Sequence, residues 1–278
     1  MAKGILSNYP YILWFGFYFT LFWLIALPFA GTGEQALIIV SALYGVSILY
    51  SLSPIAEIMW RGVSGVRSLR TESEKNRLLP LFEAVYNEVL SVYPSISKRI
   101  KLYIKEDMDV NAFAFGRTTL VLTKGSIELL NDDSLKGLIA HEFGHFAHLD
   151  THVSLIAEVG NAFMMLLMKI IRAFANIMLF IVRNKDSTYT IIFRVLYWIV
   201  NATYKTILFI GDLILMRVSR KHEFLADNFA HKCGFGRELA HVLSQIHQVS
   251  IDSPESVVEQ LRSSPPPLTK RIEKLEGL

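Results

Sequence analysis

The stretch His141-Glu142-Phe143-Gly144-His145 decides how the rest of the chain is interpreted. It lies in a segment predicted to be helical, because Asp132, Asp133 and Ser134 offer N-cap oxygens shortly before it. Two histidines four residues apart lie on one face of a helix, so both imidazoles can bind one zinc ion. Glu142 can instead reach a water molecule, accept its proton and later pass that proton to a leaving amine. The stretch therefore predicts a catalytic zinc site.

The third protein ligand of such a site must come from elsewhere in the chain. Thr151 occupies the offset at which a closely spaced third histidine would stand. The best candidate is Glu223, and Asp227 follows one turn later on the same helical face, where it can hydrogen-bond a ligand imidazole. An ordinary amphipathic helix with solvated acids is the alternative for this segment, and Glu158 is the rival ligand. The prediction is one zinc ion per chain, bound by the two histidines and Glu223.

The composition excludes several classes of protein. The chain has 278 residues, of which 52% are hydrophobic and 19% charged, and its mean hydropathy is +0.36. Soluble domains are about a quarter charged, so the balance is shifted toward lipid and away from disorder. A formal net charge of +3 is too small to indicate a nucleic-acid partner. The single cysteine, Cys233, cannot form an internal disulfide and is expected to be a reduced, buried thiol.

Four apolar stretches predict membrane spans, since a span needs about 20 predominantly apolar residues. They are Tyr11–Ala30, Ala36–Ala56, Val153–Val182 and Tyr189–Met216. A cleavable signal peptide is the alternative for the first stretch, but that stretch is long and a second one follows after a short turn. Charges such as Glu158 and Arg194 interrupt the later pair, so two long buried or interfacial helices are the alternative there.

Basic residues near the ends of the spans set the expected orientation, because they favour the cytoplasmic side. They are Lys3, then Arg61, Arg67 and Arg70, and finally Arg217, Arg220 and Lys221. The loop that contains Arg183 and Lys185 mildly violates this pattern. We therefore expect a multi-pass protein of the cell (inner) membrane whose catalytic segments face the cytoplasm.

Outside the spans, the sequence predicts a mainly helical α+β fold. Residues 71–93 are expected to form a helix in which Pro80 marks a break or a first turn. Strand-like runs follow at Ile100–Ile104 and Thr118–Thr123. The predicted organisation is a transmembrane hairpin (1–56), the first part of a catalytic domain (57–150), a second transmembrane hairpin (151–216) and the second part of the catalytic domain (217–278).

Several motifs together resemble those of the HtpX-like membrane zinc endopeptidases, which are related to the CAAX prenyl proteases. The matching motifs are Asn111–Gly116, His141–His145 with Asp150 beyond it, Glu223–Asp227 and Pro266–Arg271. The resemblance implies a gluzincin-type zinc protease domain with His141, His145 and Glu223 as metal ligands. It also implies that Glu142 is the general base.

The resemblance implies further roles for residues away from the zinc. The segment at Asn111 and Ala112 is expected to bind the substrate backbone, as an edge strand does through main-chain hydrogen bonds. The family usually has a histidine six residues before Arg271, where this chain has Pro265, which can neither donate a hydrogen bond nor carry charge. Arg271 and His222 are the candidates to stabilise the transition state in its place.

The sequence thus predicts a membrane-embedded, zinc-dependent endopeptidase that acts at the cytoplasmic face in the quality control of membrane proteins. The expected partners are polypeptide substrates, misfolded or membrane proteins among them, and the lipid bilayer, whereas nucleic acid is not expected. Two alternatives stay open. A prenyl-protein (CAAX-type) protease is expected to need more than four membrane spans and a large enclosed chamber. A zinc-containing membrane scaffold without proteolytic activity would have no use for Glu142.

Overall fold

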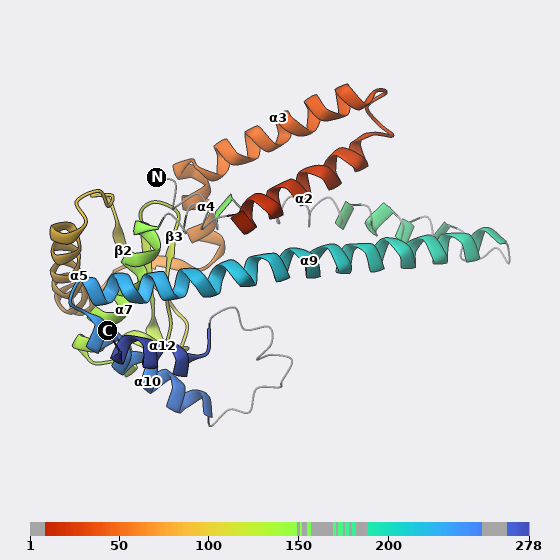
Figure 1. Ribbon diagram of the computed structural model, residues 1–278. Coiled ribbons are helices and arrows are strands. Elements are labelled where there is room, and N and C mark those ends of the chain that lie inside the picture. The colour runs from red at the N-terminus through yellow and green to blue at the C-terminus, as the bar shows by residue number, and fades with distance from the viewer. Residues whose placement is uncertain are drawn as a thin grey trace. The chain divides into compact units, whose positions relative to one another are not determined.

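The computed structural model describes residues 9–148, 151, 155–156, 169–170, 172–174, 176–177, 180–181, 188–251 and 266–277. The chain divides into two compact units, and Figure 1 labels most of their helices and two of their strands. The motif unit comprises the described residues within Tyr44–Ile156 and Met216–Leu278, and the hairpin unit those within Tyr9–Leu43 and Ala157–Leu215. Helices α3 (Gly33–Ser51) and α9 (Thr188–Lys232) contribute residues to both units.

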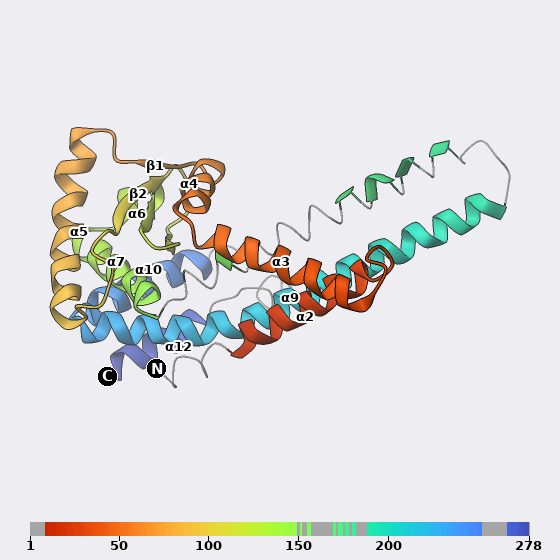
Figure 2. The same cartoon turned by 90° about the horizontal axis from the view of Figure 1, so that it is seen from above.

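In the hairpin unit, α2 (Tyr9–Ala26) and the first part of α3 form the helical hairpin that the sequence predicts (Figure 2). The connecting turn covers residues 27–32, slightly earlier than expected, and Gly31 adopts a φ of 72° that favours glycine there. The indole Nε1 of Trp23 donates a hydrogen bond to the carbonyl of Gly33 at 3.2 Å. This bond ties the two helices together at their turn.

Among the described helices, α3 is the one that is long and apolar enough to cross a membrane, while Leu13–Ala26 in α2 is apolar but shorter. The predicted second span extended to Ala56, but α3 ends at Ser51. The reason is local, because the Ser53 side chain caps a separate helix, α4 (Pro54–Val63), in which proline occupies the first turn. Most of the predicted third span lies outside the described residues.

Helix α9 runs for 45 residues, so the predicted fourth span and the segment that contains Glu223 are one helix. At the usual helical rise its length is about 67 Å, whereas the hydrocarbon core of a bilayer is about 30 Å thick. From Met216 onward, α9 belongs to the motif unit. The helix is therefore long enough to combine a span with a catalytic segment.

The motif unit contains a mixed four-stranded sheet with the strand order β1-β2-β4-β3. The strands are β1 (Val66–Ser68), β2 (Lys101–Lys105), β3 (Ala112–Phe115) and β4 (Thr119–Thr123). The two strands expected from the sequence, β2 and β4, pair in parallel at the centre, and every residue of β4 is buried. The short strands β1 and β3 pair antiparallel at the two edges. Among the described strands, β3 therefore has no partner on its outer side.

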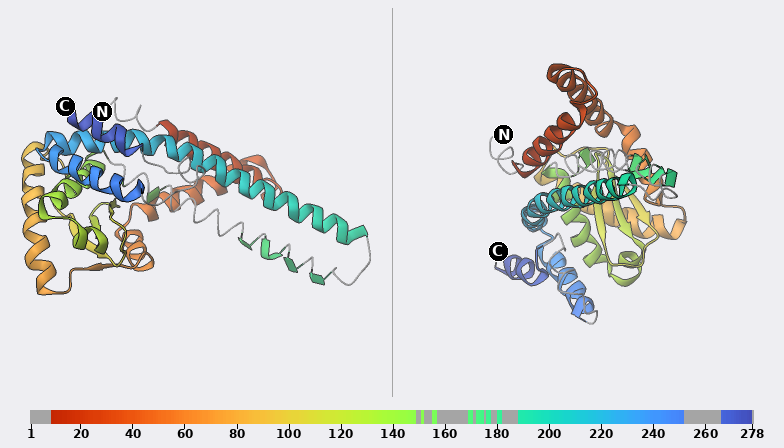
Figure 3. Two further views of the ribbon diagram at one scale, coloured as in Figure 1. Left: turned by 90° about the horizontal axis from the view of Figure 1, so that it is seen from below. Right: turned by 90° about the vertical axis from the view of Figure 1, so that its right-hand side faces the viewer.

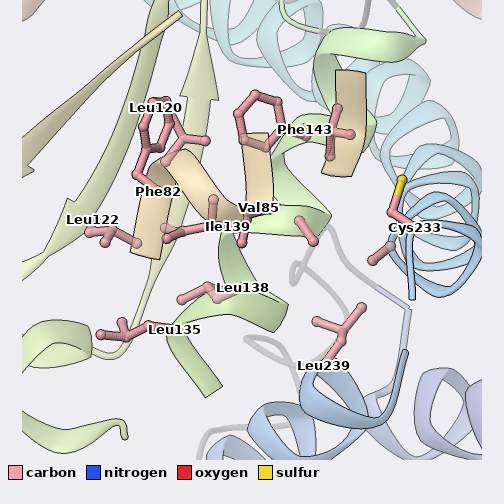
Figure 4. Packing of buried hydrophobic residues seen from close by; sticks show 14 of the residues in the cluster. Phe82, Val85, Leu120, Leu122, Leu135, Leu138, Ile139, Phe143, Cys233 and Leu239 are labelled. Carbon is pink, nitrogen blue, oxygen red and sulfur yellow. The ribbon is translucent and has the colours of Figure 1, made fainter. Parts of the chain in front are cut away.

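Helices build the core of the motif unit around this sheet. They are α5 (Glu72–Val92), α6 (Lys124–Leu129), α7 (Asp132–Ala147), α10 (Gly236–Ile251) and α12 (Leu268–Glu276), together with the end of α9. Helix α7 packs against α5, α10 and β3, and α10 also packs against α12 (Figure 3). Figure 4 shows side chains from several of these elements, such as Phe82, Leu120 and Phe143, in one hydrophobic cluster. The central position of α7 fixes the helix that carries the two histidines.

Two local expectations are corrected by the structure. Helix α5 begins with a capping box between Thr71 and Glu74, and it runs through Pro80 without the expected break. Four buried side chains hold α5 in the core, which outweighs the hydrogen bond that the proline cannot donate. The N-cap of α7 is Asn131, which precedes the three candidates chosen from the sequence and accepts a bond from the N–H of Ser134 at 2.8 Å.

Candidate metal centre

The two predicted ligand segments meet because α7 and α9 pack closely at Gly144. A Cβ atom at this position would lie 2.7 Å from the Cα of Ala226, so a larger residue would force the helices apart. Gly144 directly precedes His145, and Ala226 lies three residues after Glu223. The sequence carried a signal for this contact, since an isolated glycine inside a helix often has a packing reason.

His141, His145 and Glu223 form one group whose ligand atoms all lie within 4.8 Å of one another. Nε2 of His141 is 3.4 Å from Oε2 of Glu223, and Nε2 of His145 is 3.7 Å from Oε1 of the same carboxylate. Two donors that each lie about 2.0 Å from one ion in tetrahedral geometry are about 3.3 Å apart. The observed separations therefore suit a single ion of the size of zinc.

Asp227 sets the orientation and the tautomer of His141. Its Oδ1 lies 2.9 Å from Nδ1 of the imidazole. Nη2 of Arg271 also lies 3.4 Å from Nδ1, but the shorter contact indicates that Nδ1 carries the proton and donates it to Asp227. The lone pair of Nε2 is then left on the side of Glu223, as a metal ligand requires.

Arg271 holds both acids of α9 at once. Its Nε donates to Oδ2 of Asp227 at 2.8 Å and its Nη2 to Oδ1 at 2.7 Å, while Nη1 lies 2.7 Å from Oε2 of Glu223. The side chain comes from α12 and is only 5% exposed as a residue. The sequence suggested Arg271 for transition-state stabilisation. That role stays a prediction, and the observed contacts of its guanidinium also hold these two carboxylates in place.

The charges of this group favour a cation. Glu142, Glu223 and Asp227 supply three carboxylates against the one guanidinium of Arg271, a formal charge of −2 that one zinc ion would balance. Burial lowers the pKa of His141, but hydrogen bonds to Asp227 and Glu223 raise this pKa by more, so it lies above its usual value. Burial raises the pKa of Glu223, yet contacts with His141 and Arg271 hold it below the usual range. A site that draws a proton onto an imidazole in this way also attracts a metal ion, which displaces the proton.

Glu142 is buried next to His141 on α7 and is 4% exposed. Within the part of the chain that the structure describes, no hydrogen bond or ion pair engages its carboxylate. It therefore differs from Glu223 and Asp227, which are both bound to Arg271. A carboxylate without a fixed partner beside a metal site can exchange protons with water.

The predicted substrate segment is the edge strand β3, against which α7 packs. The carbonyl of Asn111 accepts a bond from the N–H of Thr123, so every second residue from Asn111 turns its backbone groups toward β4. The backbone groups of Ala112 and Ala114 face the open edge instead. The side-chain Oδ1 of Asn111 accepts from the N–H of Ala112 at 2.9 Å, which leaves the Ala112 carbonyl and both groups of Ala114 for an extended peptide. Ala114 is an addition to the sequence prediction.

The other residues named from the sequence have separate positions. His222 is buried directly before the third ligand on α9, and its role as a donor stays a prediction. Thr151 is buried and donates a hydrogen bond to the carbonyl of Gly116 at 2.6 Å, which ties the segment after α7 to the turn between β3 and β4. Three residues named for the centre or its motifs lie outside the described part of the chain, and they are Asp150, Glu158 and Pro265.

Two histidines and a glutamate, presented by two packed helices, are the ligand set of the His₂Glu class of zinc peptidase sites. Comparison with known proteins leads to the same class. The sequence model of the family described as Peptidase family M48 matches residues 82–278, which include all the ligand candidates. The chain belongs to this family. Membership of a metallopeptidase family implies that the centre binds a metal ion.

Individual relatives agree with this assignment. The chain is 29% identical over 206 residues to a Protease HtpX homolog of Bacteroides fragilis. This alignment covers 72% of this chain and 60% of the relative. It is 28% identical over 188 residues to Protease HtpX of Pseudomonas syringae. This alignment covers 60% of this chain and 61% of the relative. The chain thus spans about 60% of the length of these curated relatives. The crystal structure of S. mikatae Ste24p has a TM-score of 0.54 and 19% identity, and the match covers 99% of this chain and 66% of that one. At this identity the likeness shows a shared fold.

Proposed function

We propose that the chain is a membrane-embedded, zinc-dependent endopeptidase that cleaves polypeptides at the cytoplasmic face of the membrane. The observation that carries this proposal is the convergence of His141, His145 and Glu223 within 4.8 Å, beside the buried carboxylate of Glu142. The relatives described above are proteases by name, which supports the same activity. A scaffold with a structural zinc site would have no use for Glu142, so the carboxylate favours catalysis.

The residues of the centre have distinct roles in this mechanism. His141, His145 and Glu223 would hold the zinc ion, which would supply Lewis acidity to the scissile carbonyl and to the attacking water. The open edge at Ala112 and Ala114 binds the substrate as an added strand. Glu142 accepts a proton from the water that attacks the carbonyl carbon, and it delivers this proton to the amine nitrogen as the C–N bond breaks. The contacts of Arg271 and Asp227 keep the ligands in place.

The substitution Glu142→Gln tests the mechanism because it removes the base and keeps every ligand. We expect cleavage of an unfolded protein such as casein to fall by on the order of 10²–10⁴-fold, while the purified chain keeps its zinc. Glu83→Gln is the matched control, since Glu83 is exposed on α5 and should change neither property. Zinc per chain is measured by mass spectrometry alongside the cleavage rate. Cleavage by the Glu142→Gln chain at the unaltered rate would rule out the mechanism.

The proposed orientation is supported by the apolar helix α3 and by the basic residues that follow the predicted spans. The histidines of α7 can share a metal with Glu223 only if both segments lie on one side of the membrane. Reporters fused after residue 150 and after residue 278 should therefore both report the cytoplasm. Reporters on opposite sides would contradict the proposal that Glu223 is the third ligand.

We also propose that the substrates are misfolded or membrane proteins, because the candidate centre and the candidate spans belong to one chain. Proteins that accumulate in cells carrying the Glu142→Gln chain, but not the active chain, should include integral membrane proteins. If only isoprenylated proteins were affected, the prenyl-protease alternative would replace this substrate class.

A further inference from the structure

Helix α4 directs its apolar side chains outward and its carboxylate inward. The outward apolar residues lie on one helical face and are between 55% and 87% exposed; they are Ile55, Ile58, Met59 and Val63. On the inner side, Glu57 is buried and the ring of Trp60 stacks on Phe115 with the ring centroids 3.6 Å apart. A helix on the surface of a soluble domain has the opposite pattern, with its apolar face inward. Among the residues that the structure describes, the outer face of α4 therefore lacks the apolar neighbour that its sequence requires.

The orientation of α4 is fixed by the bonds of Glu57. Its carboxylate accepts hydrogen bonds from the backbone N–H groups of Arg117 and Thr118 and from the hydroxyls of Thr118 and Thr119, at 2.5 to 3.2 Å. The adjoining Gly116 has a φ of 59°, and a Cβ atom there would lie 2.8 Å from this carboxylate. These contacts fasten α4 to the turn between β3 and β4, so its apolar face cannot simply rotate inward.

A positively charged pocket of about 420 Å³ lies beside α4. It is lined by Leu52, Pro54, Glu57, Ile58, Arg61, Ser97, Lys98, Arg99, Arg117 and Thr118. Four cations face one carboxylate in this lining, which gives a formal charge of +3. The guanidinium of Arg61 donates a hydrogen bond to the hydroxyl of Thr119 and forms an ion pair with Glu57. Among the described residues, the exposed side chains of Lys98, Arg99 and Arg117 have no ion-pair partner. Three cations of the lining are therefore available to an anionic ligand.

The pocket begins where the candidate membrane span ends. Helix α3 stops at Ser51, and the next residue, Leu52, already lines the pocket. The hydroxyl of Tyr50 on α3 donates to Sδ of Met59 on α4 at 3.1 Å, which links the end of the span to the outer face of α4. Residues that directly follow a span lie at the level of the lipid headgroups.

We propose that this pocket binds the phosphate of an anionic membrane phospholipid, while the outer face of α4 enters the boundary of the acyl chains. The proposal rests on the membrane placement in the proposed function. An anionic phospholipid offers a phosphate to the three cations and hydrocarbon to the apolar face, and the two features lie side by side on α4. An acidic protein segment would satisfy the cations alone. Because Arg117 belongs to the turn that follows β3, the bound lipid also anchors the edge strand proposed to bind substrate.

Native mass spectrometry of the full chain in neutral detergent tests the headgroup site. We expect phosphatidylglycerol to be retained and phosphatidylcholine with the same acyl chains to be lost. The triple substitution Lys98→Gln, Arg99→Gln, Arg117→Gln should weaken phosphatidylglycerol binding by on the order of tenfold or more. The matched control, Lys75→Gln, Lys124→Gln, Lys136→Gln, removes the same charge from partly or fully exposed sites that are paired with acids and should bind as the unaltered chain does.

Two results of this experiment would overturn the proposal. Equal weakening by both triple variants would show that only net charge matters. Displacement of phosphatidylglycerol by glycerol phosphate or inorganic phosphate at equal concentration would show that the ligand is a soluble anion and not a lipid. The Glu142→Gln chain should bind phosphatidylglycerol as tightly as the active chain. Loss of cleavage and loss of lipid binding are therefore separate outcomes, and the failure of one proposal is distinguishable from the failure of the other.

A second measurement tests the apolar face of α4 without altering the pocket. In a Cys233→Ser chain placed in vesicles, a spin label at Met59→Cys should be more accessible to oxygen than to a water-soluble nickel reagent. A label at Glu83→Cys, which is exposed on α5, should show the reverse. Preferential access of the nickel reagent to position 59 would contradict insertion of α4 into the bilayer.

Discussion

Helices α7 and α3 are both rich in apolar residues, but their surroundings are opposite. In α7, eleven of 16 residues are buried, and they contact α5, α10 and the sheet. In α3, large apolar side chains remain exposed on several sides of the helix; they include Leu37 at 47%, Ile38 at 67% and Leu43 at 48%. Apolar groups that the protein itself does not cover must be covered by another apolar medium or associate. The positive mean hydropathy of the chain thus has two sources. Apolar residues fill the protein core around α7 and, by our proposal, contact lipid around α3.

The largest effect that separates the two environments concerns thiol reactivity. Cys233 belongs to the same core as α7, and burial, aided by Glu88, raises the pKa of its thiol to about 11. At pH 8 its reaction with a water-soluble maleimide should be about a hundredfold slower than that of an exposed cysteine. Urea that unfolds the core should abolish this protection. In a Cys233→Ser chain in vesicles, a cysteine at Ile38 should stay protected in the same urea, because lipid shields it. Fast labelling of position 38 before urea is added would contradict a lipid environment for α3.

A smaller effect is expected from adding one methyl group to a glycine in each helix. Gly144→Ala in α7 should destabilise the chain by about 2 kcal/mol, because the new Cβ atom would lie 2.7 Å from the backbone of Ala226. Gly45→Ala in α3 meets no atom within 4 Å and should stabilise the helix by up to about 0.5 to 1 kcal/mol. Urea unfolding in detergent measures both, and zinc retention against a chelator should fall for Gly144→Ala alone. Equal effects of the two substitutions would show that close packing does not distinguish the helices.

The sequence identified the parts of the centre that depend on local spacing. The histidines of α7 follow from a four-residue spacing on one helix, and the pairing of Glu223 with Asp227 follows from the same rule on α9. The central strands were also predictable, because β4 has a continuous apolar run and β2 alternates buried with less buried residues. These features need only the geometry of one helix or one strand.

Contacts between distant segments were beyond such rules. Arg271 lies 130 residues after His141 and 44 after Asp227. No periodicity of the sequence predicts that its guanidinium contacts both Asp227 and Glu223. The edge position of β3 depends on the order of strands, which a four-residue strand does not encode by itself. The end of α3 is different, because Ser53 and the proline that follows it are a recognisable helix start that the apolar run concealed.

The central claim is that His141, His145 and Glu223 bind one zinc ion. The most direct test is the position of the anomalous scattering peak at the zinc absorption edge in crystals of the zinc-loaded Glu142→Gln chain. We predict one peak per chain, within about 2.2 Å of Nε2 of both histidines and of a carboxylate oxygen of Glu223. A peak bound to the two histidines but to Glu158 in place of Glu223, or a peak away from α7, would contradict this account of the centre.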